Sequence, residues 1–299
     1  MVKFSILITT KNRLEELKVT LLSLSSLLSR NDVELLLYDD ASNDGTLAFL
    51  ESNYSTHTIL HNSKSKGLIY NRNVLMSKAK GQYAISLDDD ASFLIDNPLE
   101  KIENFFNGHK DCAVIGFRIF WGIKAPKSLK CKEPVEQMRS YVGCGHVWKL
   151  AAWKQIPEYP SWYIFYGEEE YASIHLFKNQ YKIYYLPQVL VHHRVHVKQR
   201  KEHKDYLIRL RRSLRSSWYN YSMFYPLRIV PKKILYSIYQ QIKLKVLRGE
   251  IKVLKALSLA VFDLFYNLPR IIKDRRPLSR QQLKSYEALT KTKIYWQPK

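Results

Sequence analysis

Strand-like and helix-like patterns alternate along the first 90 residues of this chain. Short apolar runs rich in β-branched residues predict strands at 3–10, 33–38, 58–60 and 83–87. Apolar residues at three- and four-residue spacing, or polar turns that open a helix-like segment, predict helices at 14–28, 46–53 and 67–79. Strands and helices in this order favour an α/β fold, with a mostly parallel sheet covered by helices on both faces.

Polar residues follow three of the predicted strands at the point where each strand ends. They occupy residues 9–13, 39–46 and 88–90. Ligands of open α/β sheets bind beyond the carboxyl ends of the strands. A solvated turn would explain each polar cluster separately, but it does not explain why all three fall on the same side. We therefore expect a binding site at this edge of the sheet.

Asp88, Asp89 and Asp90 come directly after the fourth predicted strand. Three adjacent negative charges repel one another, and burying any of them unpaired is costly. A divalent cation such as Mg²⁺ or Mn²⁺ prefers oxygen ligands and would relieve this repulsion, together with the phosphates that it carries. A solvated acidic turn is the alternative, and these three residues alone leave both interpretations open.

Beyond residue 90 the pattern predicts a helix at 98–106 and strands at 113–120 and 181–186, with loop-like sequence at 121–140. Gly143 and Gly145 either let the backbone approach a ligand or mark a bulged strand. A second acidic cluster, residues 168–170, begins a predicted helix, where acidic residues are also favoured by the helix dipole. His192 and His193 follow the last predicted strand, either as structural residues or as metal ligands.

Positive charge is concentrated in the last third of the chain. Residues 1–197 hold 23 Lys and Arg against 21 Asp and Glu, whereas residues 198–299 hold 25 against 6. This asymmetry predicts two units, a nearly neutral globular body at 1–197 and a basic amphipathic helical region at 198–299. Basic helices with aromatic residues favour an anionic membrane surface first, packing on the body second and nucleic acid third, since no nucleic-acid-binding signature appears.

Three cysteines without a CxxC pair indicate reduced thiols rather than a disulfide framework or a zinc cluster. We see no leader sequence and no run of 18 uncharged apolar residues. These features predict a cytoplasmic protein, peripheral on the inner face of the cell membrane.

The order of these motifs resembles family 2 glycosyltransferases of the GT-A fold. The resemblance covers roughly residues 3–195 and rests on the segments ILITTKNR at 6–13, DDASNDGT at 39–46, Asn62 to Asn73, LDDD at 87–90, FYGEEE at 165–170, and then Tyr181, Pro187 and the histidine pair at 192–193. Each motif is weak by itself, but the ordered set is specific.

The resemblance implies a nucleotide-sugar donor. The residues that it assigns to the nucleotide base are Thr9, Arg13, Asp39 and Asp40. Arg72 resembles the residue that reaches the diphosphate, and Asp88 or Asp89 lies near the ribose. Gly143 and Gly145 resemble the loop that faces the donor sugar.

The resemblance also implies a metal site and a catalytic base. Asp89 and Asp90 look like the DxD-type pair, in which Asp90 holds Mg²⁺ or Mn²⁺. His193, with His192 beside it, matches a histidine that in some members helps to hold the metal or the diphosphate. Glu169 matches the catalytic base, with Glu168 and Glu170 as neighbours. The family usually has Glu-Asp at the base and often an Arg later on that helix, whereas this chain has Glu-Glu and His175.

The resemblance implies an inverting, metal-dependent glycosyltransferase that acts on a glycan or lipid-linked acceptor, and together with the basic C-terminal region it implies a role in bacterial surface polysaccharide synthesis. A nucleotidyltransferase is one alternative, although residues 9–13 lack the glycine-rich loop that such enzymes generally need after the first strand. A non-catalytic protein that binds sugar nucleotides or polyanions is the other.

Overall fold

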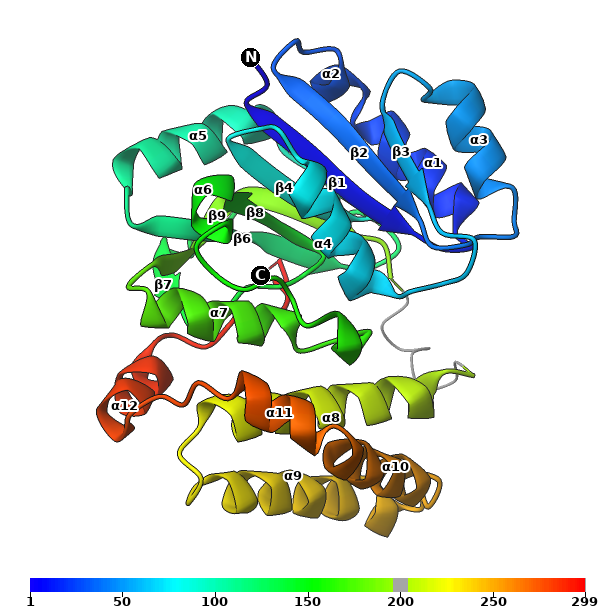
Figure 1. Cartoon of the computed structure of the whole chain (residues 1–299). Coiled ribbons are helices and arrows are strands. Elements are labelled where there is room, and N and C mark those ends of the chain that lie inside the picture. The colour runs from blue at the N-terminus through cyan, green and yellow to red at the C-terminus, as the bar shows by residue number, and fades with distance from the viewer. Residues whose placement is uncertain (196–203, 299) are drawn as a thin grey trace.

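The computed structural model describes residues 1–195 and 204–298. Its centre is a nine-stranded sheet in the order β3-β2-β1-β4-β8-β6-β9-β5, with β7 paired to β9 (Figure 1). The strands are β1 Phe4–Thr10, β2 Val33–Asp39, β3 Thr58–His61, β4 Tyr83–Asp88, β5 Ala91–Phe93, β6 Cys112–Trp121, β7 Glu136–Met138, β8 Gly145–Lys149 and β9 Lys182–His193. The first four strands pair in parallel, which confirms the expected α/β sheet.

The parallel register brings the polar strand ends together. Thr10 of β1 is the partner of Asp39 in β2, and Thr9 is the partner of Asp88 in β4. The strand that follows β4 in the sheet is β8, which runs antiparallel. Strand β8 begins at Gly145, one of the two glycines for which the sequence left two interpretations, a close approach to a ligand or a bulged strand. The segment expected as a loop at 121–140 contains the short strand β7, which pairs with β9.

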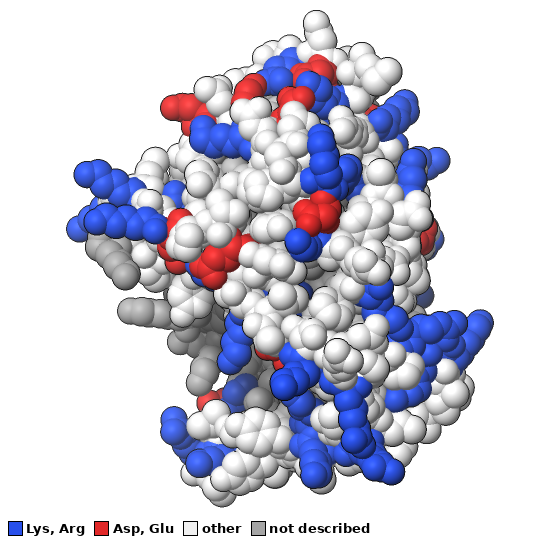
Figure 2. All heavy atoms as spheres, turned by 90° about the vertical axis from the view of Figure 1, so that its left-hand side faces the viewer, with Lys and Arg blue, Asp and Glu red and all other residues white. Residues whose placement is uncertain are grey.

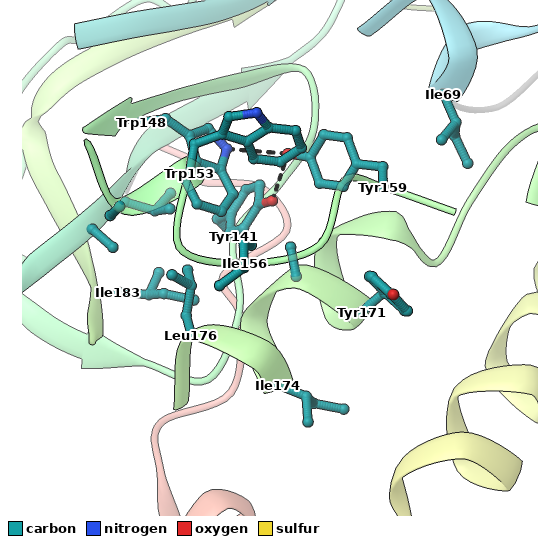
Figure 3. Close-up of a cluster of buried hydrophobic side chains, with 14 of the residues drawn as sticks. Ile69, Tyr141, Trp148, Trp153, Ile156, Tyr159, Tyr171, Ile174, Leu176 and Ile183 are labelled. Atoms are coloured by element: carbon teal, nitrogen blue, oxygen red, sulfur yellow. Dashed lines mark hydrogen bonds between the residues drawn. The ribbon is translucent and has the colours of Figure 1, made fainter. Parts of the chain in front are cut away.

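Helices cover both faces of the sheet, because successive strand residues point to opposite sides. Ile6 and Ile8 of β1 belong to a cluster with helices α1, α3 and α5, whereas Leu7 faces a second cluster with α4, α6 and α7. Figure 3 shows part of the second cluster, where Trp148 and Tyr141 contact the hydroxyl group of Tyr159. The helices of the body are α1 Leu14–Ser23, α2 Ser25–Leu28, α3 Thr46–Asn53, α4 Leu68–Lys78, α5 Pro98–Gly108, α6 Leu150–Trp153 and α7 Glu168–Lys178.

Five further helices form a layer beneath α7 (Figure 1). They are α8 Tyr206–Phe224, α9 Val230–Leu244, α10 Val253–Tyr266, α11 Leu268–Asp274 and α12 Arg280–Ala288. Tyr219, Phe224 and Tyr286 of this layer are buried in the same cluster as the sheet residues above α7. The inner apolar faces therefore pack on the body, as the second of the three interpretations expected.

The end of the chain returns to the sheet. The backbone N–H of Trp296 donates to the carbonyl of Ile119 at 2.6 Å, and the guanidinium of Arg118 lies 4.4 Å from the centre of the Trp296 ring. The division at residue 197 stays a prediction. Residues 198–203 of the predicted basic stretch lie outside the described part of the chain. Within the described part, no helix combines the length and apolarity needed to span a bilayer.

Candidate active site

Arg72 lies at the centre of the polar cluster at the carboxyl edge of the sheet. Its Nη2 atom donates to Asp88 Oδ1 at 3.0 Å and to the carbonyl of Gly143 at 2.9 Å, while Nη1 donates to Glu168 Oε1 at 2.8 Å. The side chain is buried. Burial lowers the pKa of the guanidinium, but the neighbouring carboxylates raise it by more, so the net shift is upward. Arg72 therefore stays charged and gathers residues from α4, β4 and α7 around one cation.

A strained turn delivers the acidic residues of α7 to this cluster. Ile164, Tyr166 and Gly167 all have positive φ, at 70°, 71° and 86°, directly before the helix begins. Positive φ is uncommon for a β-branched residue and costs free energy, and such strain is often held at functional sites. The side chain and carbonyl of Ile164 pack so closely on Gly67 that a Cβ there would lie 2.9 Å from its Cγ2 atom. The turn thus ties the start of α7 to the start of α4, the helix that carries Arg72.

Glu168 and Glu169 form an acidic pair beside Arg72. Burial is the main cause that raises the pKa of Glu169, to about 8, and the adjacent Glu168 adds to it while Arg72 opposes it. Burial also raises the pKa of Glu168, against the attraction of Arg72. A carboxylate with a pKa close to neutral is suited to accept a proton.

Gly143 has no side chain, and this leaves room for the side chains of Glu169 and Arg72. A Cβ at this position would lie 2.9 Å from Nη1 of Arg72 and still closer to Oε1 of Glu169. Any side chain at residue 143 would therefore displace the proposed base or the guanidinium. The Gly143 carbonyl also accepts a hydrogen bond from Arg72, so the backbone itself is part of the site.

A potential metal site lies on the other side of Asp88. Nε2 of His193 is 3.0 Å from Asp90 Oδ1 and 3.8 Å from Asp88 Oδ2. Asp88, Cys144 and His193 each offer a ligand atom, and these atoms lie within 4.8 Å of one another. Carboxylate oxygens, an imidazole and a thiol are ligand types that divalent ions accept. The carboxylates of Asp88 and Asp90, with the imidazole of His193, therefore fit the Mg²⁺ or Mn²⁺ that the sequence predicts, whereas the thiol of Cys144 is a soft ligand that these ions do not favour.

The electrostatics of this potential metal site also favour a cation. Burial alone would lower the pKa of His193, but Cys144 and Asp90 raise it by more, to about 11. The pKa of Asp90 is lowered, because His193 and Arg13 outweigh the effect of burial. The potential metal site therefore stabilises positive charge, whether on the imidazole or on a bound ion.

Asp89 faces β1 rather than the potential metal site. Its Oδ2 atom accepts from Thr10 Oγ1 at 2.8 Å, and its Oδ1 atom lies 3.0 Å from Nε of Arg13. Burial raises the pKa of Asp89 to about 7, against the attraction of Arg13. Arg13 also bonds to Asp90 at 2.5 Å. The structure therefore brings Arg13 to the aspartate run, next to the potential metal site.

Asp40 organises the loop before α4. Its carboxylate accepts hydrogen bonds from four donors, which are the Asn62 amide, the Ser65 hydroxyl and the backbone N–H groups of Lys66 and Gly67, at distances from 2.6 to 3.1 Å. These bonds lower the pKa of Asp40 despite its burial. Asp39 instead accepts from the backbone N–H of Ser42, within its own turn.

Thr9 is the partner of Tyr38 in β2 and of Asp88 in β4. It lines a small internal cavity together with Arg72, His146 and Tyr159.

Three further predicted site residues are not brought to the cluster. Gly145 lies in β8, where a Cβ would meet Val191 of the sheet at 3.4 Å. His192 bonds to the Gly122 carbonyl at 2.7 Å and lies apart from His193, since adjacent strand residues point to opposite faces. The charges that act on Glu170 are those of Arg139 and Lys233, and Asn220 bonds to it, so it faces the C-terminal layer.

Sequence reasoning missed two residues near the site. Cys144 lies between Gly143 and Gly145. The only signal in the sequence is that its side chain is a thiol, which can bind a metal. Arg194 follows the histidine pair and donates to Thr20 Oγ1 at 2.6 Å and to Ser92 Oγ at 3.1 Å. Its backbone N–H also donates to the carbonyl of Asp90.

Solved structures of other proteins share this fold. A mannosyltransferase from Pyrobaculum calidifontis, PcManGT, solved with GDP-Man and Mn²⁺, superposes with a TM-score of 0.57 at 14% identity, over 95% of this chain and 83% of that one. The S. aureus protein TarS superposes with a TM-score of 0.54 at 19% identity, over 70% of this chain and 38% of TarS. The sheet and its covering helices have the GT-A fold of these glycosyltransferases.

The first half of the sequence matches a family model and a curated relative. A sequence model described as glycosyl transferase family 2 matches residues 5–151. A Bacillus subtilis (strain 168) protein named uncharacterized glycosyltransferase YfnE is 32% identical over 90 residues, which are 29% of this chain and 23% of the relative. The chain therefore spans about a quarter of that relative. The matched residues, just under half of the chain, resemble glycosyl transferase family 2, and they include β1 to β4 with Arg72 and the aspartate run.

Proposed function

We propose that the chain transfers a sugar from a nucleoside-diphosphate sugar to a hydroxyl group of a glycan or lipid-linked acceptor, with inversion at the anomeric carbon. The observation that carries the proposal is the convergence of Arg72, Asp88 and Glu169 at the carboxyl edge of the sheet. Two GT-A structures that the fold resembles, those of PcManGT and TarS, were solved with GDP-Man and with UDP-GlcNAc. These ligands support a nucleotide-sugar donor without identifying its base or sugar.

Arg72 would bind the donor diphosphate. A guanidinium forms charge-assisted hydrogen bonds with phosphate oxygens, and these are stronger than neutral ones. The buried position of Arg72, between α4 and α7, fixes its direction. Asp88, Asp90 and His193 would hold the divalent ion, which when bound supplies Lewis-acid stabilisation of the leaving nucleoside diphosphate.

Glu169 would accept the proton of the acceptor hydroxyl as it attacks. An alcohol has a pKa far above neutral, so a nearby base is needed to remove its proton. Glu169 is only partly buried, whereas Glu168 is buried and bonded to Arg72. The partly exposed member of the pair is therefore the one that an acceptor can reach. In this proposal Glu168 keeps Arg72 in place and raises the pKa of its neighbour.

The proposal is tested with the purified chain, candidate UDP-, dTDP- and GDP-sugars, and Mn²⁺ or Mg²⁺. We expect release of the nucleoside diphosphate from one donor class, and the anomeric configuration of the product, read by NMR, to be inverted. Release of pyrophosphate in a parallel assay with a nucleoside triphosphate and a sugar phosphate would instead support a nucleotidyltransferase. Donor binding by calorimetry without any release would support a non-catalytic binding protein. The role in bacterial surface polysaccharide synthesis is a further part of the proposal, supported by the basic C-terminal region and by no single residue.

A further inference from the structure

The turn between α9 and α10 exposes apolar side chains among cations. Residues 243–255 include five Lys or Arg and one acid, Glu250, which accepts a hydrogen bond from the Tyr206 hydroxyl. Four large apolar side chains of this segment are solvent-exposed, with relative exposures of 45% for Leu244, 76% for Leu247, 66% for Ile251 and 43% for Leu254. We call residues 243–255 the apolar tip.

Packing on the body does not account for the apolar tip. The inward residues Ile238, Ile242 and Leu257 already pack around the buried Trp218 of α8. Leu254 continues along α10 into a second row of exposed residues, which includes Phe262, at 62%, and Tyr266, at 73%. A helix at the surface of a protein ordinarily presents polar residues to water. These helices instead carry one apolar face inward and another outward, and contiguous exposed apolar patches mark interaction sites.

We propose that the apolar tip and the outer face of α10 dock on an anionic lipid bilayer. This surface combines apolar side chains that can enter the lipid interface with the exposed cations Lys243, Arg248, Lys252 and Lys255. Long basic side chains keep their charge at the headgroups while their stems lie along apolar surface. Figure 2 shows the opposite side of the C-terminal layer, away from the apolar tip, and there too Lys and Arg outnumber acidic residues.

The chemistry of the patch favours lipid over other occupants. In a symmetric dimer the same cations would face one another across the contact, which is unfavourable. A nucleic acid would pair with the cations, but it gives no reason for the exposure of Leu247 and Ile251, because protein–DNA interfaces are polar. An anionic bilayer satisfies both the charges and the apolar side chains.

The apolar tip also lies on the active-site side of the molecule. In Figure 1, α9 ends on the side to which the arrowhead of β1 points, and the polar cluster lies beyond the carboxyl end of β1. The bond from Tyr206 to Glu250 fixes the tip to the start of α8. Docking would therefore bring the site towards the membrane surface, where a lipid-linked acceptor is found. This last step rests on the proposed function, whereas the docking itself does not.

Co-sedimentation of the full chain with lipid vesicles tests the docking, without donor or acceptor. We expect binding to phosphatidylglycerol-containing vesicles, weak binding to pure phosphatidylcholine vesicles, and release by high salt. The triple variant Arg248→Gln/Lys252→Gln/Lys255→Gln should lose affinity by about fivefold per charge, since each Lys or Arg near an anionic surface contributes ~1 kcal/mol. The double variant Leu247→Ser/Ile251→Ser should also weaken binding, through loss of the apolar contact.

Matched variants elsewhere separate these effects from general ones. Leu22→Ser removes an apolar side chain that is 74% exposed on α1, and Lys78→Gln/Lys80→Gln/Lys154→Gln removes three exposed charges of the body. Both controls should bind as the parent chain does. The proposal is overturned if no vesicle binding occurs, if the control triple variant loses as much affinity as the tip variant, or if Leu247→Ser/Ile251→Ser abolishes a dimer measured by light scattering and leaves vesicle binding unchanged. A failure of nucleoside diphosphate release would contradict the proposed function and leave this result standing.

Discussion

Nη1 of Arg72 donates to Oε1 of Glu168 at 2.8 Å, although 96 positions separate the two residues in the chain. Both side chains are buried, with relative exposures of 7% and 2%. Glu168 is the first residue of α7, and Arg72 lies within α4, so the ion pair joins two helices that cover the same face of the sheet. The proposed site depends on this contact, because it positions both the cation and the neighbouring base.

Breaking this pair should destabilise the fold more than replacing both partners. We expect Arg72→Met to lower the free energy of unfolding by about 3 kcal/mol, since it leaves a buried carboxylate without its cation. The double variant Arg72→Met/Glu168→Gln should recover part of this loss. Urea denaturation followed by circular dichroism measures both changes. Equal and small losses in all variants would show that the buried pair contributes little to stability.

The pKa of Glu169 predicts how activity depends on pH. A base must be unprotonated to act, and burial together with Glu168 raises the pKa of Glu169 to about 8. Nucleoside diphosphate release should therefore rise as the pH increases, by about tenfold per unit below pH 8, and then level off. A profile that levels off near pH 5 would argue against this carboxylate as the base.

Replacement of Glu169 by Gln keeps the shape of the side chain and removes the base. We expect kcat to fall by about 10²- to 10⁴-fold while donor binding, measured by calorimetry, changes little. Glu170→Gln is the matched control, since Glu170 faces the C-terminal layer, and it should retain activity. If donor affinity falls while turnover of bound donor is kept, Glu169 binds the donor instead.

Gly143→Ala should impair the site without unfolding the chain. The added methyl group would press on Arg72 and Glu169, the two side chains that the proposal places in binding and catalysis. We expect a loss of kcat/KM with a small change in Tm. Gly108→Ala is the control, because a Cβ there meets nothing within 4 Å. Unchanged kcat/KM for Gly143→Ala would mean that the close approach is not needed for the reaction.

The two adjacent histidines should differ in their effect on metal binding. Loss of an outer partner of a metal ligand costs ~10–100-fold in affinity, so removing a ligand itself in His193→Ala should weaken Mn²⁺ binding by at least about tenfold. His192→Ala should leave it unchanged, since His192 bonds to the Gly122 carbonyl. Mn²⁺ titration followed by electron paramagnetic resonance measures both without any turnover. Equal losses in the two variants would contradict the assignment of His193.

The parallel part of the sheet was predictable because its signals are local. Alternation of strand-like and helix-like segments indicates β1 to β4 and the helices between them, and parallel strands place their carboxyl ends at one edge. The antiparallel strand β8 was less predictable. Whether residues 145–149 form a ligand loop or pair with Leu87 and its neighbours depends on contacts with a strand about sixty positions earlier.

The members of the site were only partly predictable for the same reason. Motif order selects Arg72, Asp88 and Glu169, and the structure brings them together. Motif order also selects Gly145, Glu170 and His192, which lie outside the Arg72 cluster. The reason is that neighbours in sequence on a strand or helix face different directions. Cys144 shows the converse, since nothing in its local sequence distinguishes a buried thiol from a potential ligand.

The amino-acid sequence by itself determined the periodicity of the elements, the acidic strand ends and the excess of cations after residue 197, since these follow from the order of side chains along the chain. Only the tertiary structure decided that Arg72 would meet Glu168, that His193 rather than His192 would face Asp90, and that α9 and α10 would keep apolar residues on their outer faces. The physical reason is that a side chain's direction and partners are set by packing between distant segments. A sequence pattern fixes the face of a helix or strand but not what lies against it.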